Sequence, residues 1–244
     1  MDGIGYEFME KSKNKYMSES FQKRGFPQPP LELPYETSIQ TIPLVPSEQL
    51  PPYQIELKTA IEKRKTLRRY QQTSLSLEEL TYLLWITQGV REVSETTRTS
   101  RNVPSAGARH AFETYLVINR VDGLNPGLYR YLSIEHALLP INADPEISRK
   151  VFQACLNQQH VLNSAVTFVW VAVKERMYWR YGERGYRYLY LDAGHVCQNL
   201  YLGAEAVGCG VCAIAAFEDD QLNTVLGLDG DNHFAIYLGS VGKR

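Results

Sequence analysis

The sequence of 244 residues has few cysteines, no long apolar segment and no surplus of charge of either sign. Four cysteines are too few for a disulfide scaffold of this size. The longest apolar stretch, 165–173, is far shorter than the roughly 20 residues that cross a bilayer. Lys and Arg number 26 against 27 Asp and Glu, which gives no basic surplus for nucleic acid. Since the first 30 residues also hold no apolar core of a signal peptide, we expect a cytoplasmic protein without nucleic-acid or membrane partners.

Several catalytic and metal-binding patterns are missing too. The sequence has no G-x-S-x-G, no P-loop and no H-E-x-x-H, which disfavours hydrolase, nucleotide-kinase and zinc-protease functions. One C-x-x-C occurs, Cys209 and Cys212, but zinc needs about two further ligands. We therefore expect no metal and interpret these cysteines as buried structural residues. The glycines at 208 and 210 match G-x-G-x-x-A, yet a predicted helix precedes them where a dinucleotide site requires a strand.

Proline is concentrated near the N-terminus. Eight of the 12 prolines lie between Pro27 and Pro52, where neither a helix nor a central strand is expected. We predict that residues 1–53 form an arm with one short helix before Gly25, and that residues 54–244 form the globular domain. The alternative is a disordered tail, but Tyr35 and Leu44 are among several apolar residues that could dock the arm.

The remaining sequence predicts a mixture of helices and strands. Ser76 and Glu79 form a capping-box pattern before an apolar helical stripe that Gly89 ends. Asp144-Pro145 is typical of a helix start. Further helices are predicted at 55–65, 187–207 and from 218 or 219, and strands at 112–121, 128–132, 165–173 and 233–239. Because strands and helices do not alternate strictly, the fold class is α+β.

Three segments have the residue types of a binding site. Arg64, Lys65, Thr66 and Arg68 combine cations with a hydroxyl, which suits a phosphate, although a solvated helix end is an equal alternative. Pro104-Ser105-Ala106-Gly107 would let backbone N–H groups approach a flat ligand, or forms an ordinary turn. Residues 178–190 alternate tyrosines with arginines, as at a planar ligand or a subunit interface.

In order and spacing, these segments resemble the nitroreductase family, and more narrowly its SagB-type dehydrogenase branch, which includes azoline oxidases. The resemblance covers about residues 55–242. It rests on the following segments: 64–70, Pro104–Gly107, 127–129, 186–188, Asp192-Ala193-Gly194-His195, 208–217 and 238–239.

The resemblance implies an FMN-dependent oxidoreductase with a central mixed sheet flanked by helices and an intertwined homodimer. The phosphate, ribityl chain and pyrimidine edge would contact Arg64, Lys65, Thr66 and Arg68, and the chain end, Lys243 or Arg244, would complete the phosphate clamp. The partner subunit would supply Pro104, Ser105, Ala106 and Gly107 beside the ring. Backbone groups of Gly210, Val211, Cys212 and Ala213 would also face the ring.

By this resemblance, hydride passes from NAD(P)H to a small organic acceptor such as a nitroaromatic or a quinone. The alternative is flavin-dependent dehydrogenation of a peptide or natural product, with Tyr181 or Tyr186 near the reacting carbon. Azoline oxidases are expected to use a Lys-Tyr pair as base, and the nearest counterpart in the domain is Arg180-Tyr181. Arginine stays protonated and is a poor base. A flavin-binding protein without turnover and a structural dimer without cofactor are the remaining alternatives.

Overall fold

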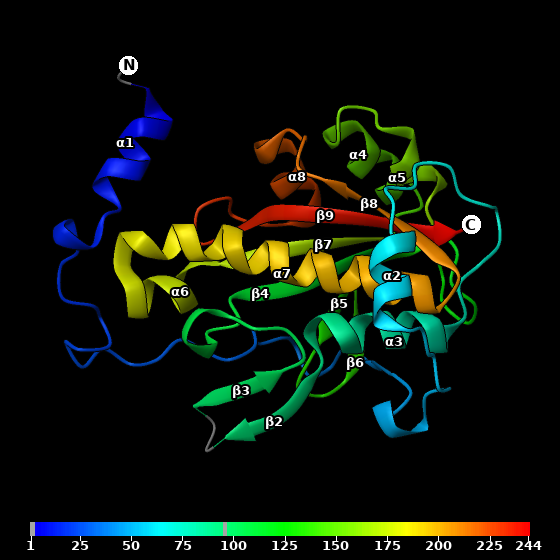
Figure 1. The fold of residues 1–244 in the computed structure, drawn as a ribbon, viewed down its shortest axis with the longest axis horizontal. Helices are drawn as coiled ribbons and strands as arrows, with labels where there is room; N and C mark the ends of the chain where they lie inside the picture. Colours follow the sequence, from blue (N-terminus) through cyan, green and yellow to red (C-terminus); the bar gives the residue numbers. More distant parts are fainter. Residues whose placement is uncertain (1–2, 95–96) are drawn as a thin grey trace.

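The computed structural model describes residues 3–94 and 97–244, and its centre is a seven-stranded sheet (Figure 1). The strand order is β1-β6-β5-β4-β7-β9-β8. These strands are β1 (Ile42–Pro43), β4 (Phe112–Ile118), β5 (Gly127–Leu132), β6 (Ala137–Asn142), β7 (Val166–Val173), β8 (Cys209–Ile214) and β9 (His233–Lys243). A separate hairpin pairs β2 (Val90–Ser94) with β3 (Arg98–Arg101).

Helices cover both faces of the sheet. One face carries α3 (Leu77–Gln88), α6 (Lys174–Tyr181) and the long α7 (Gly185–Ala206), with α2 (Leu57–Lys63) packed on α7. The other face carries α4 (Ile147–Ala154), α5 (Gln159–Asn163) and α8 (Asp219–Leu226). No helix in the described ranges is long and apolar enough to cross a membrane.

The alternation of side chains along β7 explains this layering. Phe168 and Trp170 join the core below α3 and α7, whereas Val169 and Val171 join the core below α4 and α8. Successive side chains on a strand point to opposite faces, so a strand covered on both sides must be apolar at nearly every position. This is why 165–173 is the longest apolar run in the sequence.

Most predicted elements are confirmed within a few residues, and the α+β fold is confirmed. The Ser76–Glu79 capping box is present, with Ser76 N–H donating to Glu79 and Glu79 N–H donating to Ser76 Oγ. The expected mixed character of the sheet is corrected, because every ladder among the described strands is antiparallel. Parallel pairing is limited to isolated bridges such as Thr66 with Val211.

Two helix ends differ from the expected chemistry. Helix α4 starts at Ile147, not beside Asp144, because the Asp144 carboxylate accepts from Glu146 N–H and forms a turn before the helix. Gly89 has φ −56° and is not left-handed. A Cβ at Gly89 would lie 2.3 Å from the Trp85 ring, so this position needs a small residue rather than an unusual backbone angle.

The N-terminal segment begins with α1 (Ile4–Lys11) and then runs along the edge of the body (Figure 1). Trp179 Nε1 donates to Phe26 O over 2.9 Å, and Leu33 N–H donates to Glu113 over 2.9 Å. Strand β1 of this segment already pairs with β6 of the sheet. The division of the chain at residue 53 stays a prediction.

Candidate functional site

Residues 64–68, which we call the basic segment, lie along the outer edge of β8. Helix α2 ends at Lys63, and Arg64 then turns the chain into an extended path. Leu67 N–H donates to Val211 O over 2.9 Å. Because neighbours in an extended chain point in opposite directions, Leu67 packs inward while Thr66 and Arg68 do not. A Cβ at Gly210 would lie 2.5 Å from Leu67, so Gly210 makes room for Leu67.

Tyr201 of α7 joins this segment to β8. Its hydroxyl oxygen accepts from Ala213 N–H over 3.0 Å and lies 3.3 Å from Thr66 Oγ1. The guanidinium of Arg64 lies 5.3 Å from the centre of the Tyr201 ring. Sequence reasoning missed Tyr201, although its spacing from Gly194 and Cys197 places all three on one helix face. The expected approach of Ala213 N–H to a flavin would compete with Tyr201.

The predicted phosphate-binding cations fall into two groups. Arg64, Lys65 and Arg68 are partly or fully exposed and form no ion pair with any described residue. The cations of the chain end are occupied instead. Lys243 Nζ pairs with Glu79 and donates to Val207 O over 3.0 Å. The Arg244 guanidinium pairs with Glu205 and donates to Cys209 O over 3.0 Å. Only the first group is available for an anion without breaking an existing pair.

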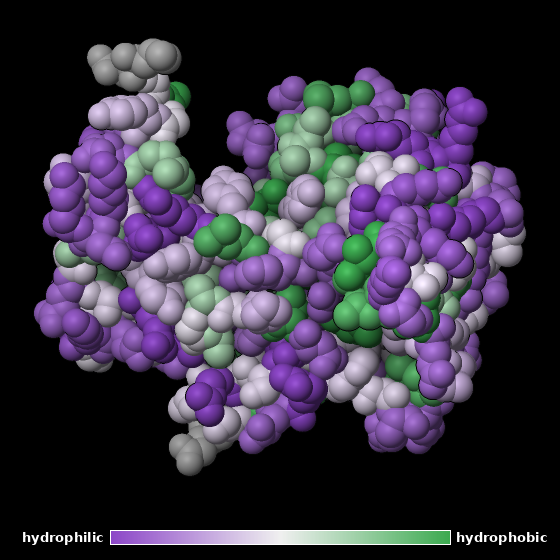
Figure 2. All heavy atoms as spheres, in the orientation of Figure 1, coloured by the Kyte–Doolittle hydropathy of each residue, from purple (hydrophilic) through white to green (hydrophobic). Residues whose placement is uncertain are grey.

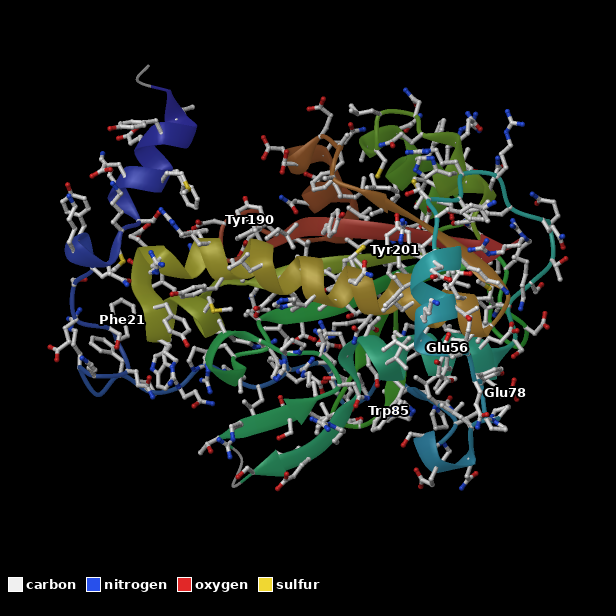
Figure 3. The ribbon with its side chains drawn as sticks, in the orientation of Figure 1. Phe21, Glu56, Glu78, Trp85, Tyr190 and Tyr201 are labelled. Atoms are coloured by element: carbon white, nitrogen blue, oxygen red, sulfur yellow. The ribbon has the colours of Figure 1, made fainter. Side chains whose placement is uncertain are left out.

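An apolar trough, which we call the α7 trough, lies along α7 on the N-terminal side of Tyr201. It has a volume of about 500 Å³. Its wall residues come from α7, from the link between β8 and α8, and from β9: Tyr190, Ala193, Gly194, Ala215, Phe217, Asp219, Phe234, Ala235, Ile236 and Tyr237. Figure 3 shows Tyr190 and Tyr201 on the same helix. A Cβ at Gly194 would meet no atom within 4 Å, so α7 is open there.

Tyr237 keeps its proton in this trough. Burial is the main cause that raises the pKa of Tyr237 to about 12, and Cys197 beside it raises the pKa further. A phenol with this pKa is neutral at physiological pH and can donate a hydrogen bond. Tyr237 was also missed at the sequence level, since nothing distinguishes it from the other 15 tyrosines.

The 104–107 segment is anchored to α7 at a different point. Ser105 Oγ donates to Asp192 Oδ2 over 2.6 Å, and Ala106 N–H donates to Asp192 Oδ1 over 3.2 Å. The loop holds left-handed backbone angles at Gly107 (φ 57°), Ala108 (φ 53°) and His110 (φ 43°). Such angles are unfavourable for residues other than glycine and are found where surrounding structure imposes them. Asp192 supplies part of that constraint.

One chain by itself does not bring Thr66 and Ser105 together. Their anchors on α7, Tyr201 and Asp192, are nine residues apart. In an α-helix this spacing gives a separation of about 13 Å along the axis and about 180° around it. The two segments therefore face different sides of α7, and a site that combines them needs a second chain.

The remaining candidates have simple structural roles. Cys209 and Cys212 are free and buried, and their spacing on β8 directs them to opposite faces of the sheet. Burial raises the pKa of Cys209 to about 12, as expected of a structural thiol. No group of His, Cys, Asp or Glu in the described part of the chain could hold a metal ion.

The two tyrosines predicted near a reacting carbon lie outside the α7 trough. The ring of Tyr181 packs against Tyr188 with 4.8 Å between centroids, and its hydroxyl would lie 2.3 Å from a Cβ at Gly107. Tyr186 lines cavities on the side of α7 that faces the N-terminal segment. Neither tyrosine touches the basic segment.

Comparison with known proteins identifies the family of this chain. The nitroreductase family model matches residues 61–243. The nitroreductase-like protein MJ1384 of Methanocaldococcus jannaschii is 32% identical over 197 residues, which cover 80% of this chain and 96% of that protein. The trifolitoxin-processing protein TfxB of Rhizobium leguminosarum is 31% identical over 135 residues, 52% of this chain and 35% of TfxB.

Solved structures share the fold. A nitroreductase-like protein from Anabaena variabilis superimposes with a TM-score of 0.71 and 27% identity, covering 85% of this chain and 42% of that one. A chain of the Escherichia coli microcin synthetase McbBCD complex gives a TM-score of 0.62 at 17% identity, covering 98% of this chain and 86% of that one. With the family match over most of its length, this chain belongs to the nitroreductase family of oxidoreductases.

Proposed function

We propose that the chain is an FMN-dependent oxidoreductase that transfers hydride between NAD(P)H and a small organic acceptor such as a nitroaromatic or a quinone. The observation that carries this proposal is the placement of three cations, Arg64, Lys65 and Arg68, that form no ion pair with a described residue. They lie in a segment that Thr66 joins, through Tyr201, to the helix that lines the α7 trough. A flavin mononucleotide has the matching shape, with a dianionic phosphate at one end and a planar ring at the other.

The residues present fit this cofactor. Guanidinium and ammonium groups bind phosphate by charge-assisted hydrogen bonds, and Thr66 Oγ1 adds a hydroxyl donor. The trough offers apolar walls and an open helix surface at Gly194 for a planar ring. FMN supplies the hydride chemistry when bound, and the protein binds it, orients it and tunes its electrostatics.

We infer that the functional unit is a homodimer. Ser105 and Thr66 are anchored to opposite sides of α7, so Pro104, Ser105, Ala106 and Gly107 would reach a ring held by the other subunit. The hydrogen bonds of Asp192 would hold that loop ready for the partner. We also propose that residues 54–244 form the flavin domain, with residues 1–53 as the arm.

No side chain has to act as a nucleophile in this proposal. Arg68 would stabilise negative charge on a neighbouring ring edge, because a fixed cation in a site of low polarity acts more strongly than in water. Arg68 also affects the Cys212 thiol. Burial raises the pKa of this thiol, and the nearby charge of Arg68 lowers it in part. Tyr237 would provide a neutral hydroxyl donor at the trough wall. NAD(P)H as the reductant would place the enzyme in the cytoplasm.

The visible spectrum of freshly purified protein is the first test. Bound flavin gives bands near ~370 and ~450 nm. Reduction by NADH or NADPH in a stopped-flow instrument, followed by reoxidation on adding a nitroaromatic or a quinone, is the expected result. A colourless protein that takes up no added FMN would refute the proposal.

A matched pair of variants tests the role of Arg68 in binding FMN. Arg68→Ala should weaken FMN binding by about tenfold or more, because a charge-assisted hydrogen bond contributes about 1.5–3 kcal/mol. Arg69→Ala is the control, since Arg69 is its exposed neighbour and points the opposite way along the extended segment. Fluorescence titration of the apoprotein with FMN gives both dissociation constants. Equal values for the two variants would contradict the role of Arg68.

A second candidate function is dehydrogenation of a peptide or natural product in the manner of an azoline oxidase. The similarity to TfxB favours it, and the trough continues past Tyr190 into a cavity that reaches Tyr186. Oxygen consumption that depends on an azoline-containing peptide and not on NAD(P)H would establish this function. NAD(P)H consumption without any response to such a peptide would support the first candidate instead.

A further inference from the structure

A second cavity lies between the N-terminal segment and the helices α6 and α7, and we call it the arm groove. Its volume is about 430 Å³. Figure 3 shows Phe21, one of its wall residues, on the N-terminal segment beside α6. Five aromatic residues from both sides line it: Phe21, Phe26, Tyr178, Trp179 and Tyr186. The α7 trough shares none of these residues.

The two walls of the arm groove are fixed to each other. Gln22 N–H donates to Trp179 O over 2.9 Å, and Trp179 Nε1 donates to Phe26 O over 2.9 Å. The Phe21 ring stacks on Phe26 with 5.0 Å between centroids and meets Tyr178 edge-on at 5.5 Å. The aromatic surfaces are therefore held in place before any ligand binds.

The charge in the groove is negative. Glu175 and Glu183 line it, and neither forms an ion pair with another residue that the structure describes. The third charged wall residue, Lys174, is already paired with Asp231 over 2.9 Å. Two carboxylates that have no ion-pair partner among the described residues thus lie beside a set of aromatic rings.

The same rings already attract guanidinium groups of this chain. Arg24 lies 4.9 Å from the centre of the Phe26 ring and 5.4 Å from that of Phe21. Arg109 lies 5.3 Å from the Trp179 ring. Neither arginine lines the groove, so the inner surface stays open to another cation.

We propose that the arm groove is a binding site for an organic cation, a guanidinium or ammonium group on a short alkyl stem. Aromatic faces and carboxylates attract such a group together, by the ring quadrupole and by direct charge attraction. Tyr186 lines both the groove and an adjoining cavity, and Tyr190 lines that cavity and the α7 trough. The bound cation therefore lies on the approach to the proposed flavin site. That placement rests on the proposed function, whereas binding in the groove does not.

Calorimetric titration of the full-length chain, with whatever flavin it retains, tests the site. The probes are agmatine, N-acetyl-arginine amide and its neutral isostere N-acetyl-citrulline amide. We expect at least one guanidinium probe to bind about tenfold or more tightly than the citrulline compound, and more weakly at high salt. Tighter binding of agmatine assigns the site to a free cation, and tighter binding of the amide assigns it to a basic peptide side chain. Equal binding of the charged and neutral amides, or no binding of either guanidinium probe, overturns the proposal.

Variants locate the binding. Glu183→Gln should weaken binding of the preferred probe by about threefold to tenfold, because it removes one unbalanced charge and keeps the shape. Tyr178→Leu should weaken it similarly by removing a ring. Glu62→Gln, on α2 outside the groove, is the control and should bind like the parent. Thermal unfolding of each variant checks the fold. If Glu183→Gln and Glu62→Gln bind the probe equally, the groove is not the site.

Discussion

The central sheet and the N-terminal segment 3–53 are held in place by different kinds of contact. In the sheet, large side chains such as Phe168 and Trp170 are completely buried. In the N-terminal segment, large apolar side chains remain exposed, with Ile4 at 88% and Tyr6 at 63%. Figure 2 shows a hollow between α1 and the body, where a cavity separates α1 from α7. Apolar burial therefore cannot be the main attachment of α1, whereas Leu44 near the other end of the segment joins the core.

Arginine side chains of the body form hydrogen bonds with the N-terminal segment. Arg176 Nε donates to Pro30 O over 2.7 Å, and Arg130 donates to Leu33 O over 2.9 Å. Nearer the N-terminus, Arg184 donates to Ser12 O over 2.8 Å and Arg187 donates to Ser12 Oγ over 2.6 Å. Because each such contact contributes little by itself, local release of the arm should be possible without unfolding of the sheet.

The largest expected effect on the free energy of unfolding concerns an ion pair at the boundary between the sheet and the N-terminal segment. Arg176 and Glu113 pair over 2.5 Å with 3% exposure of each side chain. Arg176→Leu leaves the Glu113 carboxylate buried without its cation and should cost about 3–5 kcal/mol in the free energy of unfolding. Urea unfolding measures this loss. The double variant Arg176→Leu/Glu113→Leu should recover part of it. A loss below ~1 kcal/mol in the single variant would show that this boundary is as weak as the rest of the arm contacts.

The next effect concerns pH. Burial, together with the nearby charges of Arg101 and Arg109, lowers the pKa of His110 to about 3. The unfolded chain takes up this proton near pH 6.5, as ordinary histidine does. As the pH falls from 6.5 toward 3, the unfolded state is protonated first. His110 should therefore lower the free energy of unfolding by up to about 1.4 kcal/mol per pH unit in this window.

His110→Asn should reduce that slope because it removes the titrating imidazole. Asparagine is chosen because it tolerates the left-handed backbone angle at this position. Unfolding free energies between pH 7 and pH 5 give the measurement. The control is Gln198→Asn on the exposed surface of α7, which changes no titratable group and should leave the slope unchanged. An unaltered slope in His110→Asn would mean that this histidine is not kept neutral by its surroundings.

The smallest effect belongs to the arm itself. Arg187→Ala removes the contacts to Ser12 Oγ and to Met9 O, yet it should change the free energy of unfolding by less than ~1 kcal/mol. Limited proteolysis should nevertheless cleave the arm faster than in the parent. Arg149→Ala on α4 is the matched exposed control. Should cleavage rates stay the same, residues other than Arg187 hold α1 in place.

Much of the fold was predictable from local chemistry. The apolar run 165–173 and the Ser76–Glu79 box produced β7 and α3 as expected. Strand β6 and helix α6 were not foreseen, because β6 contains a proline and α6 is rich in charged and aromatic residues. Their places depend on pairing with β5 and packing against α7, which are contacts distant in sequence.

For the site, the sequence shows which residue types are present but not which residues they contact in the folded chain. The cations of 64–68 stand out in the sequence, but nothing there indicates that Lys243 and Arg244 are paired with Glu79 and Glu205. Hydrogen bonds such as those of Tyr201 and Asp192 join positions 12 to 135 residues apart. Local patterns carry no information on such pairs.

Amino-acid order by itself determined which segments are apolar on two sides, which positions cap helices and where cations cluster, because these depend on neighbours within a few residues. Tertiary structure decided that Thr66 and Ser105 lie on opposite sides of α7, and that an acidic, aromatic groove forms beneath the arm. Both outcomes depend on which distant segments pack against each face of the helices. This packing is set only when the whole chain has folded.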